Sequence, residues 1–408
     1  MRAEVIATAL NGHFIWSILL CKFTDHPEEP RSPQFFQDFI AGHSQGSIAD
    51  YWSAMSYGAL DMSGANLFGW LDLGRPADAD FMKMSRWDKT QACVNAASKA
   101  LAGDSAASLR LFECSGFICI TNAGAGESGR TGNRVLLDSN YWRHAYAAHE
   151  TGHVLGFDHS FDNRESPWDA YDDGREGAYG NSRDIMSAET FGFLPATFDS
   201  HFGPAGPGMN AINRAAVGWL AADRITDLSF VPGVPWNSQF YVSSLDNVAA
   251  RGNPLFRITG NGRYRDATLP TVVYTVEFRP RSGWDAGLPE DAVVIHSTTH
   301  GDPDPEGDVP RITWAGNDSQ DWHKGDRFCD VLCGLTIDIM FIADDHQSAS
   351  VAIAVGPKVG LPNMSVRRTL SHRYDLSQGL KQVRPALWAS TESVRERLLA
   401  HPPQFAAI

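Results

Sequence analysis

The sequence predicts an α+β domain with a mixed sheet, followed by an all-β sandwich domain, and three observations support this fold class. Residues 15–137 alternate between apolar strand-like runs and amphipathic helix-like runs. A helix-like run at about 140–156 carries a histidine-rich motif. From about Ile225, short β-rich runs are separated by Gly, Pro, Asn and Asp. We expect domains at 1–223 and 224–356, and a partly helical C-terminal extension at 357–408.

The elements of the first domain follow from local patterns. In order, we expect a strand at 17–25, helices at 33–42 and 47–58, a hairpin at 60–73, a helix at 87–104, and strands at 117–123 and 133–139. The helix at 140–156 comes next, and an irregular segment leads to a helix within 208–220. Either strand directly before the histidine-rich helix could bind an extended substrate, or could be purely structural.

The histidine-rich motif is HETGHVLGFDH, which has the spacing H-E-x-x-H-x-x-G-x-x-H. His149 and His153 lie one helical turn apart, so both imidazoles can reach one metal ion. Gly156 can adopt a left-handed conformation that ends the helix, and His159 then supplies a third ligand. Three ligands leave one position of a tetrahedral Zn²⁺ for water, and Glu150 next to the first ligand is placed as general base and acid. The motif predicts a catalytic zinc; a structural zinc would recruit a fourth Cys or His and would not need the glutamate.

The segment SRDIMSAETFG, after the motif, extends the pattern. With Met186 in a turn at about 184–188, the chain resembles the metzincin clan of zinc endopeptidases, in which a methionine turn lies beneath the metal. The resemblance implies that role for Met186; an ordinary core methionine is the alternative. Some metzincins carry a tyrosine two residues after the methionine that contacts the metal or the oxyanion. Ala188 occupies that position here, so Tyr171 and Tyr179 are the candidate substitutes.

A narrower resemblance covers residues 15–355. The blocks SIADYWSAMSYGALDMSGANLFGWLDL, GMNAINRAAVGWL and VVYTVEFRPRSGWDAGLPEDAVVIH are similar to the secreted peptidases of the immune inhibitor A and gametolysin groups. Immune inhibitor A does not use the third histidine in this way, so His159 favours the gametolysin-like side. The resemblance implies a secreted zinc endopeptidase that acts on proteins or peptides.

Bulk composition is compatible with this interpretation. The net charge of -14 argues against nucleic acid or an anionic membrane surface as the main partner, and no run of eighteen apolar residues predicts a membrane span. An extracellular location is expected, although residues 1–23 carry no clear signal peptide. Six cysteines are an even number that fits disulfides, with Cys114–Cys119 a candidate hairpin staple; buried free thiols are the alternative. The oligomeric state is left open.

Two further ligands are candidates. Asp162, Asp169, Asp172 and Asp173 lie in an acidic stretch that could gather around Ca²⁺, although acidic surface loops are common without an ion. In the β domain, exposed Trp284, Trp314 or Trp322 could stack on a glycan, unless they are core tryptophans. Two other functions therefore stay open: a narrow metallopeptidase directed at glycoproteins or cell-wall proteins, and a non-enzymatic binding protein stabilised by its metal.

Overall fold

The computed structural model describes residues 10–163, 177–187, 196–230, 234–247, 250, 252–260, 271–300, 311–313, 315, 319–330 and 334–356. These residues fall into two compact units. The N-terminal unit consists of residues 10–158 and 197–206, and the β-rich unit consists of the described residues within 159–196 and 207–356. The expected extension at 357–408 lies outside the described residues.

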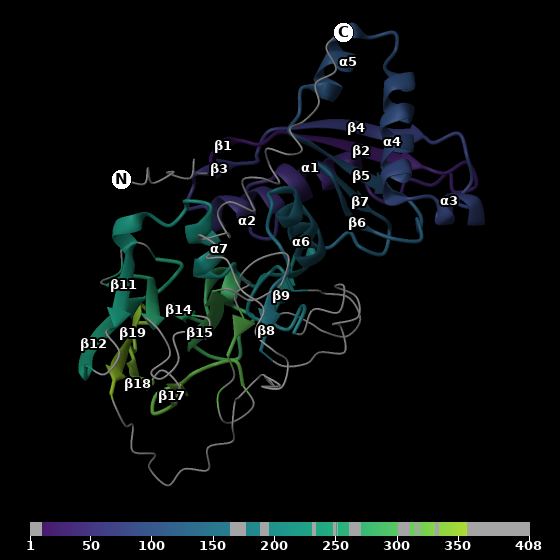
Figure 1. Cartoon of the computed structure of the whole chain (residues 1–408). Helices are drawn as coiled ribbons and strands as arrows, with labels where there is room; N and C mark the ends of the chain where they lie inside the picture. The colour runs from purple at the N-terminus through teal and green to yellow at the C-terminus, as the bar shows by residue number, and fades with distance from the viewer. Residues whose placement is uncertain are drawn as a thin grey trace, which may run out of the picture. The chain divides into compact units, whose positions relative to one another are not determined.

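The N-terminal unit is built on a five-stranded mixed sheet (Figure 1). In spatial order its strands are β4 (Ala65–Asp72), β2 (Trp16–Lys22), β5 (Gly116–Thr121), β7 (Arg134–Leu137) and β6 (Gly129–Thr131). The first four strands run parallel, and β6 runs antiparallel to β7. The short strand β6 therefore ends the sheet on one side.

The helices of this unit begin where short polar side chains cap them. They are α1 (Pro33–Ala41), α2 (Ile48–Met55), α3 (Ala79–Lys83), α4 (Arg86–Ala100) and α5 (Ser105–Phe112). Ser32, Ser47 and Ser85 precede α1, α2 and α4, and each hydroxyl accepts a backbone N–H of the first turn. Asp78 and Asp104 do the same for α3 and α5. Such caps satisfy N–H groups that have no partner within the helix.

Both faces of the sheet are covered. Leu19 and Cys21 of β2 pack in one core with Cys93 of α4, and α4 contacts strands along the sheet. Ile18 and Leu20 point to the opposite face because strand side chains alternate, and both are fully buried. Helix α1 contacts β2 and β4, so apolar surface is removed from water on both sides.

The expected hairpin at 60–73 is wrong. Strand β3 (Leu60–Asp61) pairs in parallel with β1 (Gly12–His13), whereas β4 pairs in parallel with β2. The Asp61 carboxylate accepts the N–H of Ser63 at 2.8 Å, a local turn that directs the chain from one sheet into another. Strand β6 and helix α5 were not expected.

The β-rich unit contains two larger sheets that share one core. One sheet has the order β11-β13-β14-β15-β16-β8 and the other β12-β19-β18-β17. The strands are β8 (Phe161–Asp162), β11 (Ile225–Phe230), β12 (Trp236–Ser243), β13 (Leu255–Gly260), β14 (Thr271–Arg279), β15 (Ala292–His300), β16 (Arg311–Ile312), β17 (Arg327–Asp330), β18 (Leu335–Ile342) and β19 (Ser348–Val355). Apolar residues from both sheets, such as Val276 and Ile353, belong to one buried cluster. This is the layering of a β-sandwich.

A buried ion network attaches residues 207–223 to this unit. Arg279 is fully buried and makes two 2.6 Å bonds to Asp285 and a 3.0 Å bond to Glu277. Glu277 also accepts the N–H of Ala211, the first residue of α7 (Ala211–Ala216), at 2.6 Å. These contacts explain why the division between the units differs from the boundary expected at 223/224.

The described cysteines Cys21, Cys93, Cys114, Cys119 and Cys329 are all free. The expected Cys114–Cys119 staple is absent: Cys119 lies in the buried core with Cys93, whereas Cys114 Sγ donates to the carbonyl of Leu111 at 3.5 Å. Cys333 lies outside the described residues. Within the described part of the chain, helices that combine the length and the apolar character needed to cross a bilayer are absent.

Candidate metal centre

The helix that carries the motif is α6 (His144–Val154). It begins four residues later than expected because Asp138 organises a turn: its carboxylate accepts the N–H of Asn140 at 2.9 Å and its carbonyl accepts that of Tyr141 at 3.0 Å. The helix ends at Val154, and Gly156, two residues later, turns the chain with a φ of +93°. The N–H of Gly156 bonds to His153 O and that of Phe157 bonds to Gly152 O, the paired closure of a Schellman motif.

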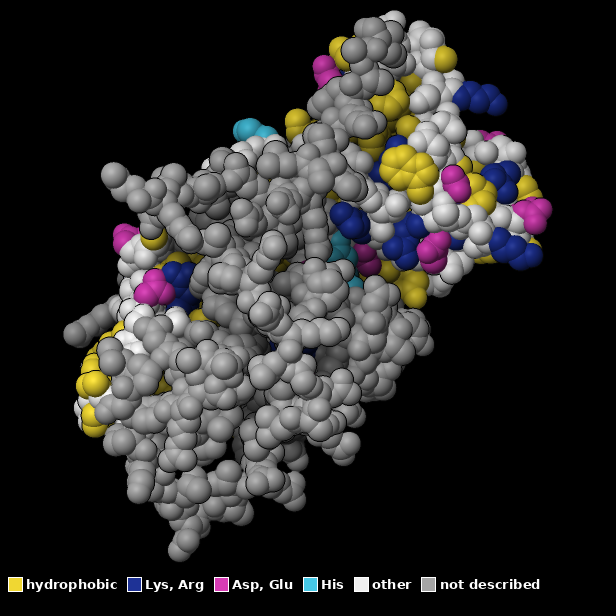
Figure 2. Space-filling model, in the orientation of Figure 1, with side chains coloured by type: hydrophobic (Ala, Val, Ile, Leu, Met, Phe, Trp, Pro, Cys, Tyr) yellow, Lys and Arg dark blue, Asp and Glu magenta, His cyan; other side chains and the backbone are white. Residues whose placement is uncertain are grey.

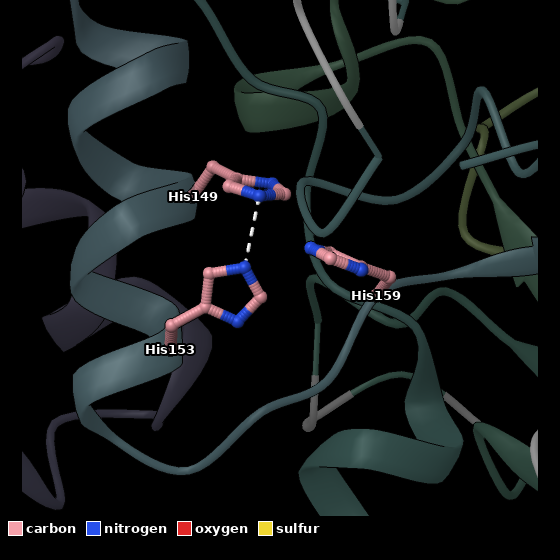
Figure 3. Close-up of side chains that lie close together, drawn as sticks. All are labelled: His149, His153 and His159. Carbon is pink, nitrogen blue, oxygen red and sulfur yellow. Dashed lines mark hydrogen bonds between the residues drawn. The ribbon is translucent and has the colours of Figure 1, made fainter. Parts of the chain in front are cut away.

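His149, His153 and His159 come together as the motif predicts. One ring nitrogen from each lies within 4.8 Å of the other two. Figure 3 shows His149 and His153 projecting from the same face of the helix, while His159 points toward them from the chain that follows it. Among the described residues, this is the one group of side chains placed to share a metal ion.

The ring orientation of His153 suits a metal ligand. Its Nδ1 lies 2.8 Å from the carbonyl oxygen of Phe157, which can only accept, so Nδ1 carries the proton of the neutral ring. The lone pair is then on Nε2, which lies 3.0 Å from Nε2 of His149 (Figure 3). A backbone carbonyl that fixes the tautomer in this way is a common support for metal-binding histidines.

The donor set fits zinc. Three imidazoles without a thiolate or a fourth histidine match three-ligand zinc sites with an open position. In such sites two ligand nitrogens about 2.0–2.1 Å from the ion are separated by about 3.3 Å, close to the spacing of the two helix histidines. Imidazole also binds Cu, Fe and Ni, so the ligand set itself does not distinguish zinc from these metals.

Glu150 is held by groups of its own unit. Its side chain is 8% exposed, and Oε2 accepts the backbone N–H of Arg130 in β6 at 2.7 Å. Tyr146, one turn earlier on α6, also bonds to the carboxylate; burial, followed by the Glu150 charge and this hydrogen bond, raises the pKa of Tyr146. The phenol therefore stays protonated and donates to the glutamate.

Packing behind the helix fixes its rotation. Thr151 is fully buried, and its hydroxyl accepts the indole N–H of Trp52 at 2.8 Å. The same indole stacks on Phe157 with ring centres 5.8 Å apart and planes 6° apart. Since Thr151 follows Glu150 directly, helix α2 helps to decide which residues of α6 face the metal centre.

Met186 lies in a turn, as the sequence predicts, but this turn belongs to the β-rich unit rather than to the N-terminal one. Its side chain is fully buried, its carbonyl accepts the N–H of Ser160 at 3.0 Å, and its N–H donates to Asp184 at 2.8 Å. The turn is thus bonded to the residue that follows His159. Asp184 also accepts the N–H of Asn210 at 2.7 Å, a contact that local sequence patterns could not reveal.

Tyr179 is the candidate tyrosine that the structure describes near a ligand. Its ring centre lies 4.1 Å from that of His159, with the planes tilted by 44°. Its φ of +58° is unusual for a residue with a side chain, and such conformations gather at functional sites. Tyr171 lies outside the described residues.

Of the four aspartates predicted to bind calcium, the structure describes Asp162. Asp162 is buried and lies against the 177–180 turn, where a Cβ added to Gly180 would meet its carboxyl carbon at 2.4 Å. It does not belong to a group of described residues that could share an ion. Asp169, Asp172 and Asp173 lie outside the described residues.

The glycan prediction is wrong for two of its tryptophans. Trp284 and Trp322 are 6% and 5% exposed, and Trp322 donates its indole N–H to Thr313 at 3.2 Å. Core tryptophans of this kind have no face to offer a sugar. Trp314 lies outside the described residues.

The strands expected to bind substrate backbone are both interior. Strand β5 lies between β2 and β7, and β7 lies between β5 and β6, so neither has an unpaired edge. Strand β6 is the edge, and Gly129 and Thr131 face Leu136 and Arg134 across the ladder. The N–H of Arg130 points away from β7 to Glu150, and its carbonyl accepts Arg86 at 2.9 Å.

A histidine on the same helix is not a ligand but predicts a pH effect. His144 is fully buried, which lowers its pKa to about 3. Below the ordinary pKa of 6.5 the unfolded chain binds this proton and the folded chain does not, so stability falls as pH drops from about 6.5 toward 3. In the zinc-free protein, the free energy of unfolding should fall between pH 7 and about pH 4.5. This decrease should be about 2 to 3 kcal/mol smaller in His144→Phe than in wild type.

Urea unfolding of both proteins at the two pH values measures this difference. The His201→Gln variant serves as the control, since it removes an exposed histidine from the same unit. An unchanged pH dependence in His144→Phe would show that His144 is not the group responsible.

Comparison with models of known protein families gave no match, and a search among curated proteins found no similar sequence. The metzincin resemblance thus remains a prediction from the sequence.

Proposed function

We propose that this protein is a zinc-dependent endopeptidase. The observation that supports the proposal is the convergence of His149, His153 and His159, with the buried Glu150 directly after His149 on α6. A purely structural zinc gains nothing from Glu150, whereas hydrolysis needs a base beside the metal.

When bound, zinc would supply Lewis acidity, which polarises a peptide carbonyl and makes water acidic enough to attack near neutral pH. His149, His153 and His159 would hold the ion. The remaining chemistry belongs to the chain: Glu150 accepts the proton of the attacking water and passes it to the leaving amine. One of its oxygens, Oε2, is fixed by the N–H of Arg130.

A fixed carboxylate favours this role. Oε2 is tied to a backbone group of the sheet rather than to a mobile side chain, so the carboxylate loses little freedom when the substrate arrives. Tyr146 bonds to the same carboxylate. Its hydroxyl donates, so the carboxylate has a second hydrogen-bond partner on α6 itself.

The proposal is tested by metal content and turnover of the full chain. We expect about one zinc per chain, hydrolysis of an unstructured protein such as casein, loss of hydrolysis after chelation, and recovery with zinc. Cleavage restricted to glycosylated substrates would instead support the narrower peptidase. A folded protein that binds no metal, or a zinc-loaded protein that cleaves neither substrate class, would contradict the proposal. The secreted location stays a prediction.

A further inference from the structure

The outward-facing peptide groups of strand β6 are used inside the N-terminal unit. Arg130 is the central residue of this three-residue strand, and its N–H and C=O both point away from β7. The N–H donates to Glu150 at 2.7 Å, and the C=O accepts the guanidinium of Arg86 at 2.9 Å. The peptide groups of Arg130 thus link Arg86, in the first turn of α4, to Glu150.

Arg86 is itself anchored. Its Nη2 lies 3.0 Å from the carboxylate of Glu127, and Lys89, one turn later on α4, bonds to the same carboxylate at 2.9 Å. Lys89 is 1% exposed and also donates to the carbonyl of Met82 at 3.0 Å. A buried ammonium needs such partners, so the Lys89–Glu127 pair fixes the chain just before β6.

Gly129 shows how closely the guanidinium lies on the strand. A Cβ added there would meet Cζ and Nη1 of Arg86 at 2.7 Å, and the φ of Gly129 is +134°. The backbone conformation favours glycine, and a side chain at this position would displace the guanidinium. Arg86 therefore lies directly on the backbone of β6.

We propose that Arg86 is a positioning residue for Glu150: by fixing the β6 backbone, it holds the Arg130 N–H against the carboxylate. This inference rests on the proposed peptidase function. Among the described residues, Arg86 bonds to the carbonyl of Arg130 and to Glu127 rather than to Glu150 or the three histidines, so it acts through the peptide of Arg130. In Figure 2, basic side chains lie beside acidic ones on the visible face of this unit. The Arg86–Glu127 ion pair is about one-third exposed on both sides and by itself contributes little to stability. What distinguishes Arg86 is its hydrogen bond to the backbone of β6.

The test compares Arg86→Gln with a matched charge removal. Lys99→Gln removes the same charge from the exposed far end of α4. We expect Arg86→Gln to lower kcat about tenfold or more, with KM within about twofold and zinc content unchanged, because a misplaced base slows the chemical step. Arg86→Lys should give an intermediate kcat, since an ammonium cannot span both partners as a guanidinium fork does. Lys99→Gln should match wild type.

Amide hydrogen exchange tests the same contact without turnover. The Arg130 N–H should exchange about tenfold faster or more in Arg86→Gln and in Glu150→Ala than in wild type or Lys99→Gln. Unchanged exchange and unchanged kcat in Arg86→Gln would overturn the positioning role. A higher kcat would also overturn it, since Arg86 would then hold Glu150 in a position that slows the reaction. If the wild-type chain hydrolyses nothing, the proposed function fails, but the exchange result still decides whether Arg86 positions Glu150.

Discussion

Glu150→Gln is expected to lower kcat by about a thousandfold while one zinc stays bound, because the amide cannot accept the proton of the attacking water. Glutamine suits this test better than alanine. Its carbonyl oxygen can still accept the Arg130 N–H, which reaches Glu150 at 2.7 Å, so the strand and the helix keep their contact. The loss then reports on proton transfer rather than on a collapsed site. The measurement is steady-state hydrolysis of a fluorogenic peptide, with zinc determined on the same sample.

Glu113→Gln provides the control for this substitution. It makes the same chemical change at an exposed residue next to α5, and its kcat should equal that of wild type. Two outcomes would count against Glu150 as the base: a kcat within about tenfold of wild type, or zinc loss that accounts for the whole decrease.

The convergence of the three histidines could be predicted from the sequence because its parts are local. The helical repeat brings His149 and His153 to one face, and Gly156 closes the helix within three residues of the second ligand. His159 follows after a short turn. Such a segment needs little help from distant residues to bring its histidines together, and three imidazoles favour the metals that bind nitrogen, zinc among them.

The support of Glu150 could not be predicted. Arg130 lies twenty residues before it, and Arg86 lies forty-four residues before Arg130. Strand β6 reads Gly-Arg-Thr, with neither apolar alternation nor β-branched enrichment to reveal it. Its contact with Glu150 exists only because β6 adds to the edge of a sheet whose other strands come from far along the chain. A lone glycine before an arginine was the available signal, and it is too common to interpret.

The division between the units was missed for a similar reason. Local patterns place the end of the first domain where the β-rich runs begin, near residue 224. Glu277 and Arg279, however, form buried bonds with Ala211 and Asp285, and Asp184 bonds to Asn210. Buried charges need partners, and these partners tie the methionine turn and α7 to strand β14. Sequence periodicity carries no information about such long-range pairs.

His159→Ala is expected to weaken zinc binding by about a thousandfold, because it removes a direct ligand, whereas changes in the supporting shell already cost 10- to 100-fold. At a fixed zinc concentration above saturation, the stabilisation of the folded chain by zinc should then fall by about 4 kcal/mol. Competition with a chromogenic chelator measures the affinity, and thermal unfolding with and without zinc measures the stability.

His144→Phe is the matched control, since it removes another histidine from the same helix region without touching the three-histidine group. Its zinc affinity should equal that of wild type. If His159→Ala binds zinc as tightly as the control, the third ligand is not His159 and the open catalytic position has no basis. Together, His159→Ala and Glu150→Gln distinguish a peptidase from a binding protein stabilised by zinc. A peptidase would lose turnover in both variants. A binding protein would lose stability in His159→Ala and would lose no function in Glu150→Gln.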